Sequence, residues 1–124
     1  MTMGAEEIVL LHWQAANARD WTCFATLLAP ELIYEVPQTR ERVRGSAGYL
    51  EFFRTWPGNW RADIVQLIAD GQRAVTTIDF ISDAGRETGI SFFEVREGLI
   101  SRITDYWPSA YDPPPRMTAC IERY

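Results

Sequence analysis

Lysine is absent from this sequence, and all twelve basic residues are arginine. An enzyme that forms a Schiff base between a lysine and its substrate is therefore excluded. Histidine occurs once, as His12, and the two cysteines, Cys23 and Cys120, stand far apart in the chain. Neither residue type has the spacing of a metal site, so we expect no bound metal ion. Isolated cysteines are typical of reduced thiols in a cytosolic protein.

Long apolar runs and an excess of positive charge are also absent. Seventeen acidic residues against twelve basic ones give a net charge of −5, which argues against nucleic acid or an anionic membrane as a partner. No apolar stretch approaches membrane-spanning length, and residues 1–7 contain two acids and no cationic leader. We therefore expect a cytoplasmic protein that binds neither nucleic acid nor membrane.

Aromatic residues, in contrast, are abundant. Five tryptophans, five tyrosines and six phenylalanines occur among 124 residues, a length that suits one domain with a real core. Aromatic rings bring large buried areas and flat walls to a structure. We therefore expect either a heavily aromatic core or an apolar pocket.

Three helices are predicted in the first half of the chain. Residues 5–18 have apolar side chains at positions 8, 11, 15 and 18, which is the spacing of an amphipathic helix. Asp20 is a typical N-cap for a second, short helix over residues 21–28, which Pro30 ends. A third helix is expected from Ser46 to about residue 55, before a turn that contains proline and glycine.

Five strands complete the expected fold. They cover residues 31–36, 60–69, 73–82, 87–96 and 99–107, and hairpin turns join the last four. Residues 38–44 are predicted to be a polar connection, and residues 109–124, with three consecutive prolines, an extended arm. The order α-α-β-α-β-β-β-β predicts a single α+β domain over residues 1–124, with the helices on one face of the sheet.

Two aspartates, Asp79 and Asp105, stand among bulky apolar residues in the predicted strands. Because burying an unpaired carboxylate costs free energy, each acid needs a partner, a hydrogen-bond network or a chemical role. Strand alternation places Asp105 on the face of Ile103 and Trp107, and an ion pair with Arg102 is the alternative. For Asp79 the hairpin at residues 83–85 decides the face, because a shift of one residue reverses it.

Several short segments, taken in order, resemble the nuclear transport factor 2-like superfamily. They are Asn17-Ala-Arg-Asp-Trp21, Arg44-Gly-Ser-Ala-Gly-Tyr-Leu-Glu-Phe-Phe53, Phe93-Glu-Val-Arg-Glu-Gly-Leu-Ile100 and Asp105-Tyr-Trp107. Within that superfamily the chain is most similar to SnoaL-like proteins, a group named for polyketide cyclases. It also resembles limonene-epoxide hydrolases and ketosteroid isomerases. The resemblance implies a cone-shaped, curved antiparallel (mixed) sheet wrapped around three N-terminal helices, with a hydrophobic pocket between sheet and helices.

The resemblance also implies roles for the two strand aspartates. Asp105 falls on the catalytic aspartate of the epoxide hydrolases, and SnoaL-like cyclases use a pocket aspartate as general acid/base. Asp79 falls on the second aspartate of the hydrolases, but Thr77 stands where those enzymes have an arginine. Val36 occupies the place of the general base of ketosteroid isomerases. The resemblance therefore implies a pocket acid and specifies neither of these two reactions.

Other polar and aromatic side chains are candidates for the same pocket. His12 is either a satisfied core residue or a second proton-transfer group, since histidine titrates near neutral pH. Ser91 or Tyr34 has a hydroxyl that could hold a developing oxyanion. By resemblance, Ser91 falls near the protonated aspartic acid of the isomerases and His12 near their tyrosine. The expected substrate-binding residues are Tyr34, Trp56, Trp60, Ser91, Phe93 and Trp107.

The leading hypothesis is an enzyme that uses no metal ion and no organic cofactor. Asp105 would act as general acid or base, with Asp79 or His12 as the second group. The substrate would be an apolar ring compound with a carbonyl, an activated C–H bond or an epoxide. The alternative is a non-catalytic ligand-binding or dimerisation module of the same fold. A homodimer is expected under both hypotheses, and an apolar outer sheet face that includes Val75 or Ile90 would favour it.

Overall fold

The computed structural model describes residues 3–124. Of residues 1–7, which were considered above as a possible leader, the first two lie outside the described residues. Within this range three helices form near their expected positions: α1 (Ala5–Ala18), α2 (Trp21–Thr26) and α3 (Ser46–Arg54). The Asp20 side chain accepts a 3.1 Å hydrogen bond from the Cys23 backbone N–H. Asp20 therefore caps α2, as its sequence position predicts.

The strands of the described chain join in a six-stranded sheet. They are β1 (Leu28–Val36), β2 (Glu41–Arg44), β3 (Trp60–Asp70), β4 (Arg73–Ser82), β5 (Gly85–Arg96) and β6 (Leu99–Tyr106). Their spatial order is β2-β1-β6-β5-β4-β3. β1 and β6 run parallel, and the other neighbouring pairs run antiparallel. The sheet is therefore mixed, and β1 lies directly beside the strand that carries Asp105.

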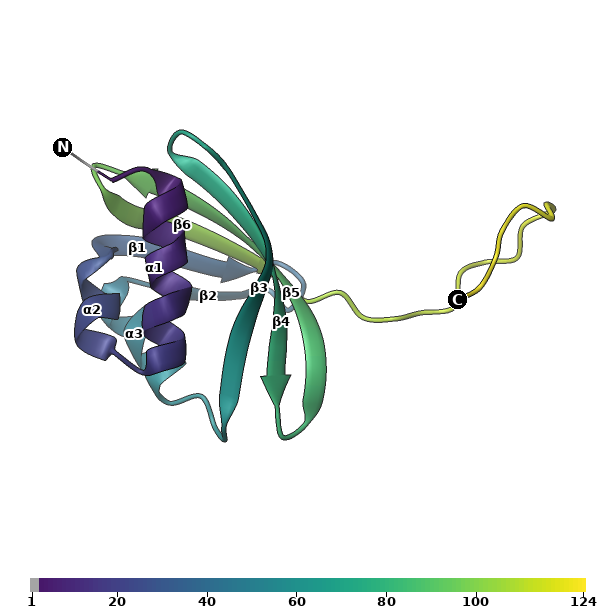
Figure 1. Ribbon diagram of the computed structural model, residues 1–124, viewed down its shortest axis with the longest axis horizontal. Helices are drawn as coiled ribbons and strands as arrows, with labels where there is room; N and C mark the ends of the chain where they lie inside the picture. The colour runs from purple at the N-terminus through teal and green to yellow at the C-terminus, as the bar shows by residue number, and fades with distance from the viewer. Residues whose placement is uncertain (1–2) are drawn as a thin grey trace.

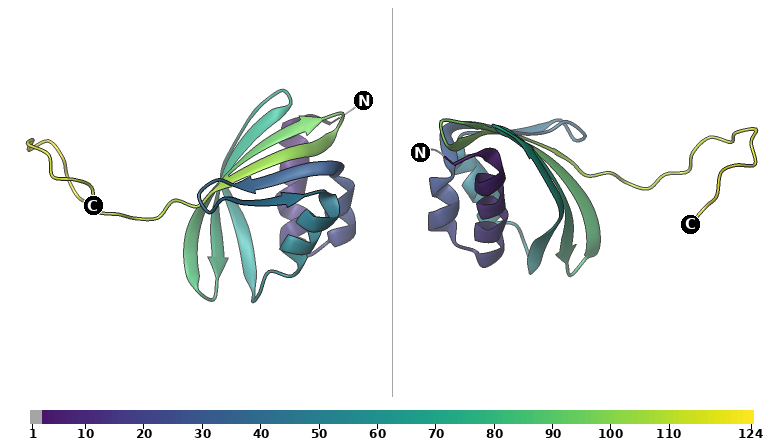
Figure 2. Two further views of the ribbon diagram at one scale, coloured as in Figure 1. Left: turned by 180° about the vertical axis from the view of Figure 1, so that it is seen from behind. Right: turned by 45° about the horizontal axis from the view of Figure 1, so that its top comes forward.

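The sheet curves strongly, and the helices pack against its concave side (Figure 1). α1 packs on β3, β4 and β5, whereas α3 packs on β1 and β2. The right-hand view of Figure 2 shows the strands arching over the helices as one wall of a cone. The predicted α+β class, with a curved mixed sheet around three N-terminal helices, is confirmed.

Residues 38–44 differ from their predicted form, because the second half of this polar connection is the edge strand β2. Val43 is the one apolar residue among its four positions, so the sequence has no alternation that would indicate a strand. Charged side chains suit an edge strand because they discourage pairing with another chain. A turn with Arg40 at φ 63° brings β2 back along β1 and sets Glu41 opposite Val36.

Side chains on the strands alternate between the helix side and the outer face of the sheet. On β6, Ile103 and Asp105 are buried on the helix side, whereas Arg102 and Tyr106 point outward. Glu35 of β1 also lies on the outer face, where its carboxylate is 2.8 Å from the Arg102 guanidinium. The alternative that Arg102 pairs with Asp105 is therefore not found.

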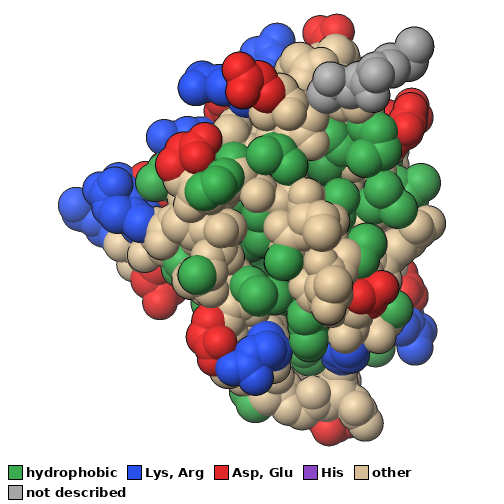
Figure 3. Space-filling model, turned by 90° about the vertical axis from the view of Figure 1, so that its left-hand side faces the viewer, with side chains coloured by type: hydrophobic (Ala, Val, Ile, Leu, Met, Phe, Trp, Pro, Cys, Tyr) green, Lys and Arg blue, Asp and Glu red, His purple; other side chains and the backbone are tan. Residues whose placement is uncertain are grey.

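The outer face of the sheet carries exposed apolar side chains. They include Ile68, Phe92 and Tyr106, and the side chains of Val75 and Ile90 are half-buried among their neighbours. On the opposite side of the molecule, acidic and basic side chains are mixed around hydrophobic ones (Figure 3). An apolar outer face of this kind was expected to favour a homodimer. The homodimer itself remains a prediction.

Residues 107–124 form no helix or strand and run away from the body of the domain (Figure 1). Tyr111, Met117 and Tyr124 in this segment are exposed. In the part of the chain that the structure describes, no helix combines the length and the apolar character needed to cross a membrane.

Candidate active site

A cavity of about 330 Å³ lies between the concave side of the sheet and the helices. Its volume is at the lower end of the range for small-molecule sites, which is about 300–1,000 Å³. Aromatic rings from α1, α3 and several strands form most of its wall. These aromatic residues are Trp13, Tyr34, Phe52, Phe53, Trp56, Trp60, Phe80 and Trp107.

Asp105 is the buried acid of this cavity. It lines the cavity from β6 and is only 5% exposed. Oδ2 accepts a 2.7 Å hydrogen bond from the Tyr34 hydroxyl, whereas Oδ1 has no hydrogen-bond partner within residues 3–124. Burial raises the pKa of Asp105 from 3.8 to about 6, and the hydrogen bond from the Tyr34 hydroxyl opposes this rise. The carboxyl therefore titrates close to neutral pH, where general acid/base catalysis is most effective.

Tyr34 orients the Asp105 carboxyl from the neighbouring strand β1. The parallel pairing sets Tyr34 opposite Ile103, two residues before Asp105 on the same face of the sheet. The Tyr34 ring packs on Tyr49 and Phe52 of α3, with ring centroids 5.1 and 5.3 Å away. Burial and the nearby Asp105 raise the pKa of the Tyr34 hydroxyl far above its usual value, so the hydroxyl stays protonated and donates.

Replacing Tyr34 with phenylalanine is expected to raise the pKa of Asp105 above about 6. The substitution removes a hydrogen bond that favours the ionised carboxyl and leaves the burial that disfavours it. A titration of the Asp105 carboxyl carbon by NMR measures the change. The control is Tyr49→Phe, because the Tyr49 hydroxyl contacts His12. An Asp105 pKa that is unchanged or lower in Tyr34→Phe would contradict this role of Tyr34.

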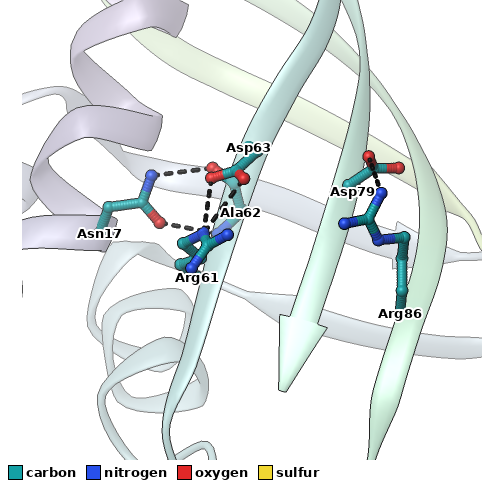
Figure 4. Close-up of polar contacts among 6 residues, drawn as sticks. All are labelled: Asn17, Arg61, Ala62, Asp63, Asp79 and Arg86. Atoms are coloured by element: carbon teal, nitrogen blue, oxygen red, sulfur yellow. Dashed lines mark hydrogen bonds and ion pairs between the residues drawn. The ribbon is translucent and has the colours of Figure 1, made fainter.

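Asp79, the second acid expected in the pocket, lies on the outer face of the sheet instead. Ile78 and Phe80, its neighbours on β4, both line the cavity, so alternation turns Asp79 away from it. There its carboxylate is 3.3 Å from the Arg86 guanidinium on β5 (Figure 4). The predicted position of Asp79 in the pocket is therefore incorrect, because the β4–β5 register sets the opposite face.

His12 is fully buried behind the cavity wall and does not line the cavity. Its Nε2 atom lies 2.7 Å from the Tyr49 hydroxyl oxygen. The rings of Trp13, Phe24 and Phe93 surround it at centroid distances of 4.5 to 5.1 Å. Burial lowers the pKa of His12 from 6.5 to about 3, so the imidazole is neutral at physiological pH. The structure thus gives His12 the surroundings of a core residue.

Trp60 is a wall residue that the end of α1 holds in place. The guanidinium of Arg19 lies 3.9 Å from the centre of the Trp60 ring, in the geometry of a cation–π contact. The Asn17 side chain donates to the Ala62 carbonyl and accepts from the Ala62 N–H, both at 2.8 Å (Figure 4). These contacts tie the helix to β3 at the point where Trp60 enters the cavity.

Trp107 closes the cavity beside β5, where its ring lies directly over Gly89. A Cβ atom at position 89 would be 2.9 Å from two atoms of the Trp107 ring, which is closer than side chains pack. The Gln38 side chain fixes the Trp107 backbone, since it donates to the carbonyl at 2.7 Å and accepts from the N–H at 2.8 Å. The small Gly89 and the Gln38 clamp together set the position of this wall.

The structure brings four of the six expected binding residues to the cavity. These are Tyr34, Trp56, Trp60 and Trp107, whereas Ser91 and Phe93 are buried on β5 outside its lining. Nine further residues line the cavity and were not among the expected binding residues: Trp13, Val36, Thr39, Glu41, Phe52, Phe53, Ile78, Phe80 and Glu87. Alternation along β4 could have found Phe80, because it shares a face with the apolar Ala74 and Ile78.

Within residues 3–124, His, Cys, Asp and Glu side chains form no group of three that could hold a metal ion. The expectation that the protein uses no metal or organic cofactor stays a prediction.

Comparison with known proteins relates this chain to several proteins of the same fold. A protein of Kribbella flavida DSM 17836, provisionally named a ketosteroid isomerase, is 40% identical, with a TM-score of 0.91 over 96% of this chain and 88% of that chain. An LEH-like epoxide hydrolase of M. tuberculosis is 24% identical, with a TM-score of 0.70 over 84% of this chain and 82% of that chain. A protein of Sinorhizobium meliloti, provisionally named a polyketide cyclase, is 19% identical, with a TM-score of 0.70 over 80% and 93% of the two chains.

The last two likenesses show the fold alone, and no curated protein matches the chain. A match to the SnoaL-like domain family extends over residues 9–103, from within α1 into β6, and includes most of the cavity wall. The chain therefore belongs to the SnoaL-like domain family.

Proposed function

We propose that this protein catalyses proton transfer on an apolar ring compound, with Asp105 as its single general acid/base and no metal or organic cofactor. The observation that carries the proposal is the state of the Asp105 carboxyl. Tyr34 holds one oxygen, the other is unpartnered within the described chain, and the group lines an aromatic cavity. Because burial places the pKa of Asp105 at about 6, the carboxylate is available as a base at neutral pH.

The number of acids in the cavity favours one class of reaction over another. Glu41 and Glu87 lie at its exposed edge, and neither His12 nor Asp79 reaches it, so Asp105 is the one buried carboxyl or imidazole lining it in residues 3–124. A single carboxylate can take a proton from one carbon and return it to another. Opening an epoxide with water requires one group to activate the water and another to protonate the oxygen. Isomerisation or ring closure therefore fits this site better.

In the proposed reaction, ionised Asp105 removes a proton from a carbon next to a carbonyl group. The electron pair of the C–H bond moves into the carbonyl and gives an enolate, and the proton stays on the Asp105 carboxyl. The same carboxyl then returns the proton to a different carbon of the substrate. Tyr34 keeps the carboxyl oriented in both steps through its hydrogen bond to Oδ2. A positioned acid/base of this kind typically accelerates a reaction by about 10²–10⁴-fold.

The experiment follows exchange of the α-hydrogens of cyclic ketones, 2-tetralone among them, for deuterium in D₂O by NMR. The wild-type protein is expected to catalyse the exchange, and Asp105→Asn is expected to lose at least about a hundredfold of the rate, because the amide cannot take the proton. Asp79→Asn makes the same chemical change on the outer face and should keep the rate. Equal exchange by the wild-type protein and Asp105→Asn would refute the proposal.

A second candidate, a non-catalytic ligand-binding module, is favoured by one observation. The Tyr34 hydroxyl donates its hydrogen bond to Asp105, so it is not free to donate one to an enolate oxygen. Under this hypothesis cyclic ketones would bind and raise the melting temperature, but the wild-type protein would not speed their exchange.

A further inference from the structure

Every charged side chain that lines the cavity is acidic. Asp105 lies in its interior, and Glu41 of β2 and Glu87 of β5 lie at its edge. Arginine provides all cationic side chains of this protein apart from its single histidine, and none of the described arginines lines the cavity. A carboxylate or phosphate that entered this cavity would meet negative charge and no fixed cation.

The arginines are instead held elsewhere on the molecule. The ion pairs of the described chain join Arg42 and Arg102 to Glu35, Arg54 to Glu51, Arg61 to Asp63, Arg86 to Asp79, and Arg123 to Asp112. Arg19 stacks on Trp60 and donates to backbone carbonyls. Arg40 lies in the turn next to Thr39 but does not join the lining. No arginine of the described chain therefore lines the cavity beside its three acidic side chains.

The two glutamates stand on different strands of the sheet and make no ion pair within residues 3–124. Glu41 accepts a 2.6 Å hydrogen bond from the Thr39 hydroxyl, which also lines the cavity. Glu87 is paired in register with Phe80, and both residues belong to the lining. The edge of the cavity thus carries two acidic side chains that make no ion pair with an arginine of the described chain.

The aromatic wall has the chemistry that binds cations. Phe80 packs on Trp56 and Trp107 at near-perpendicular angles, with ring centroids 6.3 and 5.6 Å away. An ammonium group is attracted to the face of such rings, most strongly to tryptophan. The aromatic rings and the acidic side chains line one cavity, and both kinds of group attract an ammonium group.

We infer that the natural ligand is a ring compound that carries a protonated amine, with its ring in the aromatic cavity and its ammonium group at the exposed edge, where Glu41 and Glu87 line the cavity from separate strands. The inference rests on the proposed function of the cavity as the substrate site and specifies the class of substrate. Asp105 lines the same cavity and adds a third acidic side chain to it. Compounds with a carboxylate or phosphate in the same place are rejected.

Three probes of equal size test this inference: naphthalen-2-ylmethylamine, naphthalen-2-ylmethanol and 2-naphthoate. Binding is measured by calorimetry and by the shift in melting temperature at about pH 7.5, where the amine is protonated and the carboxylates are ionised. We expect the amine to bind most tightly, the alcohol more weakly and the carboxylate not at all. Raising the salt concentration from about 0.02 M to about 0.5 M should weaken binding of the amine until it approaches that of the alcohol, because exposed charges are screened.

The double variant Glu41→Gln, Glu87→Gln should weaken binding of the amine about fivefold and leave binding of the alcohol unchanged, since each exposed charge contributes modestly. Glu94→Gln on β5 is the matched control, because Glu94 is an exposed glutamate outside the lining.

Equal binding of amine and alcohol, or tighter binding of the carboxylate, would overturn the inference and leave the proposed ligand site intact. Failure of all three probes to bind would overturn both.

Discussion

Replacing Asp105 with asparagine is expected to be more favourable to stability at neutral pH than in mild acid. The quantity compared is the free energy of unfolding of the variant minus that of the wild-type protein. In the wild-type protein burial raises the pKa of Asp105 from 3.8 to about 6. The folded state therefore binds this proton more tightly than the unfolded state does, and the contribution of Asp105 to stability falls as pH rises from about 4 to about 6. The total loss is about 3 kcal/mol, at about 1.4 kcal/mol for each pH unit between the two pKa values.

Asparagine cannot ionise, so the variant has no such loss. The free energy of unfolding of Asp105→Asn minus that of the wild-type protein should grow by about 3 kcal/mol between about pH 3.5 and pH 7.5. Chemical denaturation at a series of pH values measures this difference. Glu35 and Glu51, whose pKa values ion pairing lowers, respond in the same way in both proteins, so their effects cancel.

Asp79→Asn is the control for this measurement, because it makes the same change at a half-buried carboxylate that is paired with Arg86. It shows what the change from carboxylate to amide does on the outer face of the sheet, outside the cavity. If the difference for Asp105→Asn were flat, or fell as pH rises, Asp105 would be stabilised in its ionised form and could not have a pKa raised by burial. The same variant that loses the proposed activity is thus expected to gain stability at neutral pH, as buried acids kept for function commonly show.

The fold could be predicted from the sequence because its signals are local. The spacing of Ile8, Leu11 and Ala15 indicates the face of α1, and Asp20 marks the start of α2. The turn at Glu97 and Gly98 has both residues at positive φ, which is the geometry that such a two-residue hairpin requires. β2 could not be predicted in this way, because its hydrogen bonds to β1 depend on a pairing that its charged sequence does not indicate.

The candidate site was predictable where strand alternation alone decides the face. Asp105 follows Ile103 at the spacing of one face, and no irregularity intervenes. Asp79 depends instead on the register of β4 against β5, which the length of one hairpin sets and which a single residue reverses. Glu41 and Glu87 reach the cavity only because strands distant in sequence meet at its edge, so composition and spacing could not place them.

Replacing His12 with glutamine is expected to have the largest effect on stability. The difference in stability from the wild-type protein should rise toward low pH, whereas that of the Asp105 variant rises toward neutral pH. Burial lowers the pKa of His12 from 6.5 to about 3. The unfolded chain therefore gains a proton that the folded protein does not accept, and the contribution of His12 to stability falls as pH falls from about 6.5 toward 3. The full loss is about 5 kcal/mol. Glutamine has no such titration, so the variant should gain relative stability in acid by this amount.

The side-chain amide of glutamine can reach the position of Nε2, where the Tyr49 hydroxyl lies. A constant cost of the substitution does not affect the test, because the quantity measured is how the difference from the wild-type protein changes with pH. Chemical denaturation between about pH 4 and pH 7 follows it, and about 3 kcal/mol of the full change falls in this range. If the difference did not rise toward low pH, His12 would bind a proton in the folded protein, and its assignment as a neutral core residue would be wrong.

The two titrations also act against one another in the wild-type protein. Between about pH 4 and pH 6, each unit of acidification costs about 1.4 kcal/mol through His12 and returns about the same through Asp105. Their sum is nearly flat, so a pH scan of the wild-type protein alone shows neither of them. Asp105→Asn exposes the slope from His12, and His12→Gln exposes the slope from Asp105. The double variant should again be nearly flat over this range, because the variants remove equal and opposite slopes. A steep slope in the double variant would mean that other groups dominate the pH dependence of this fold.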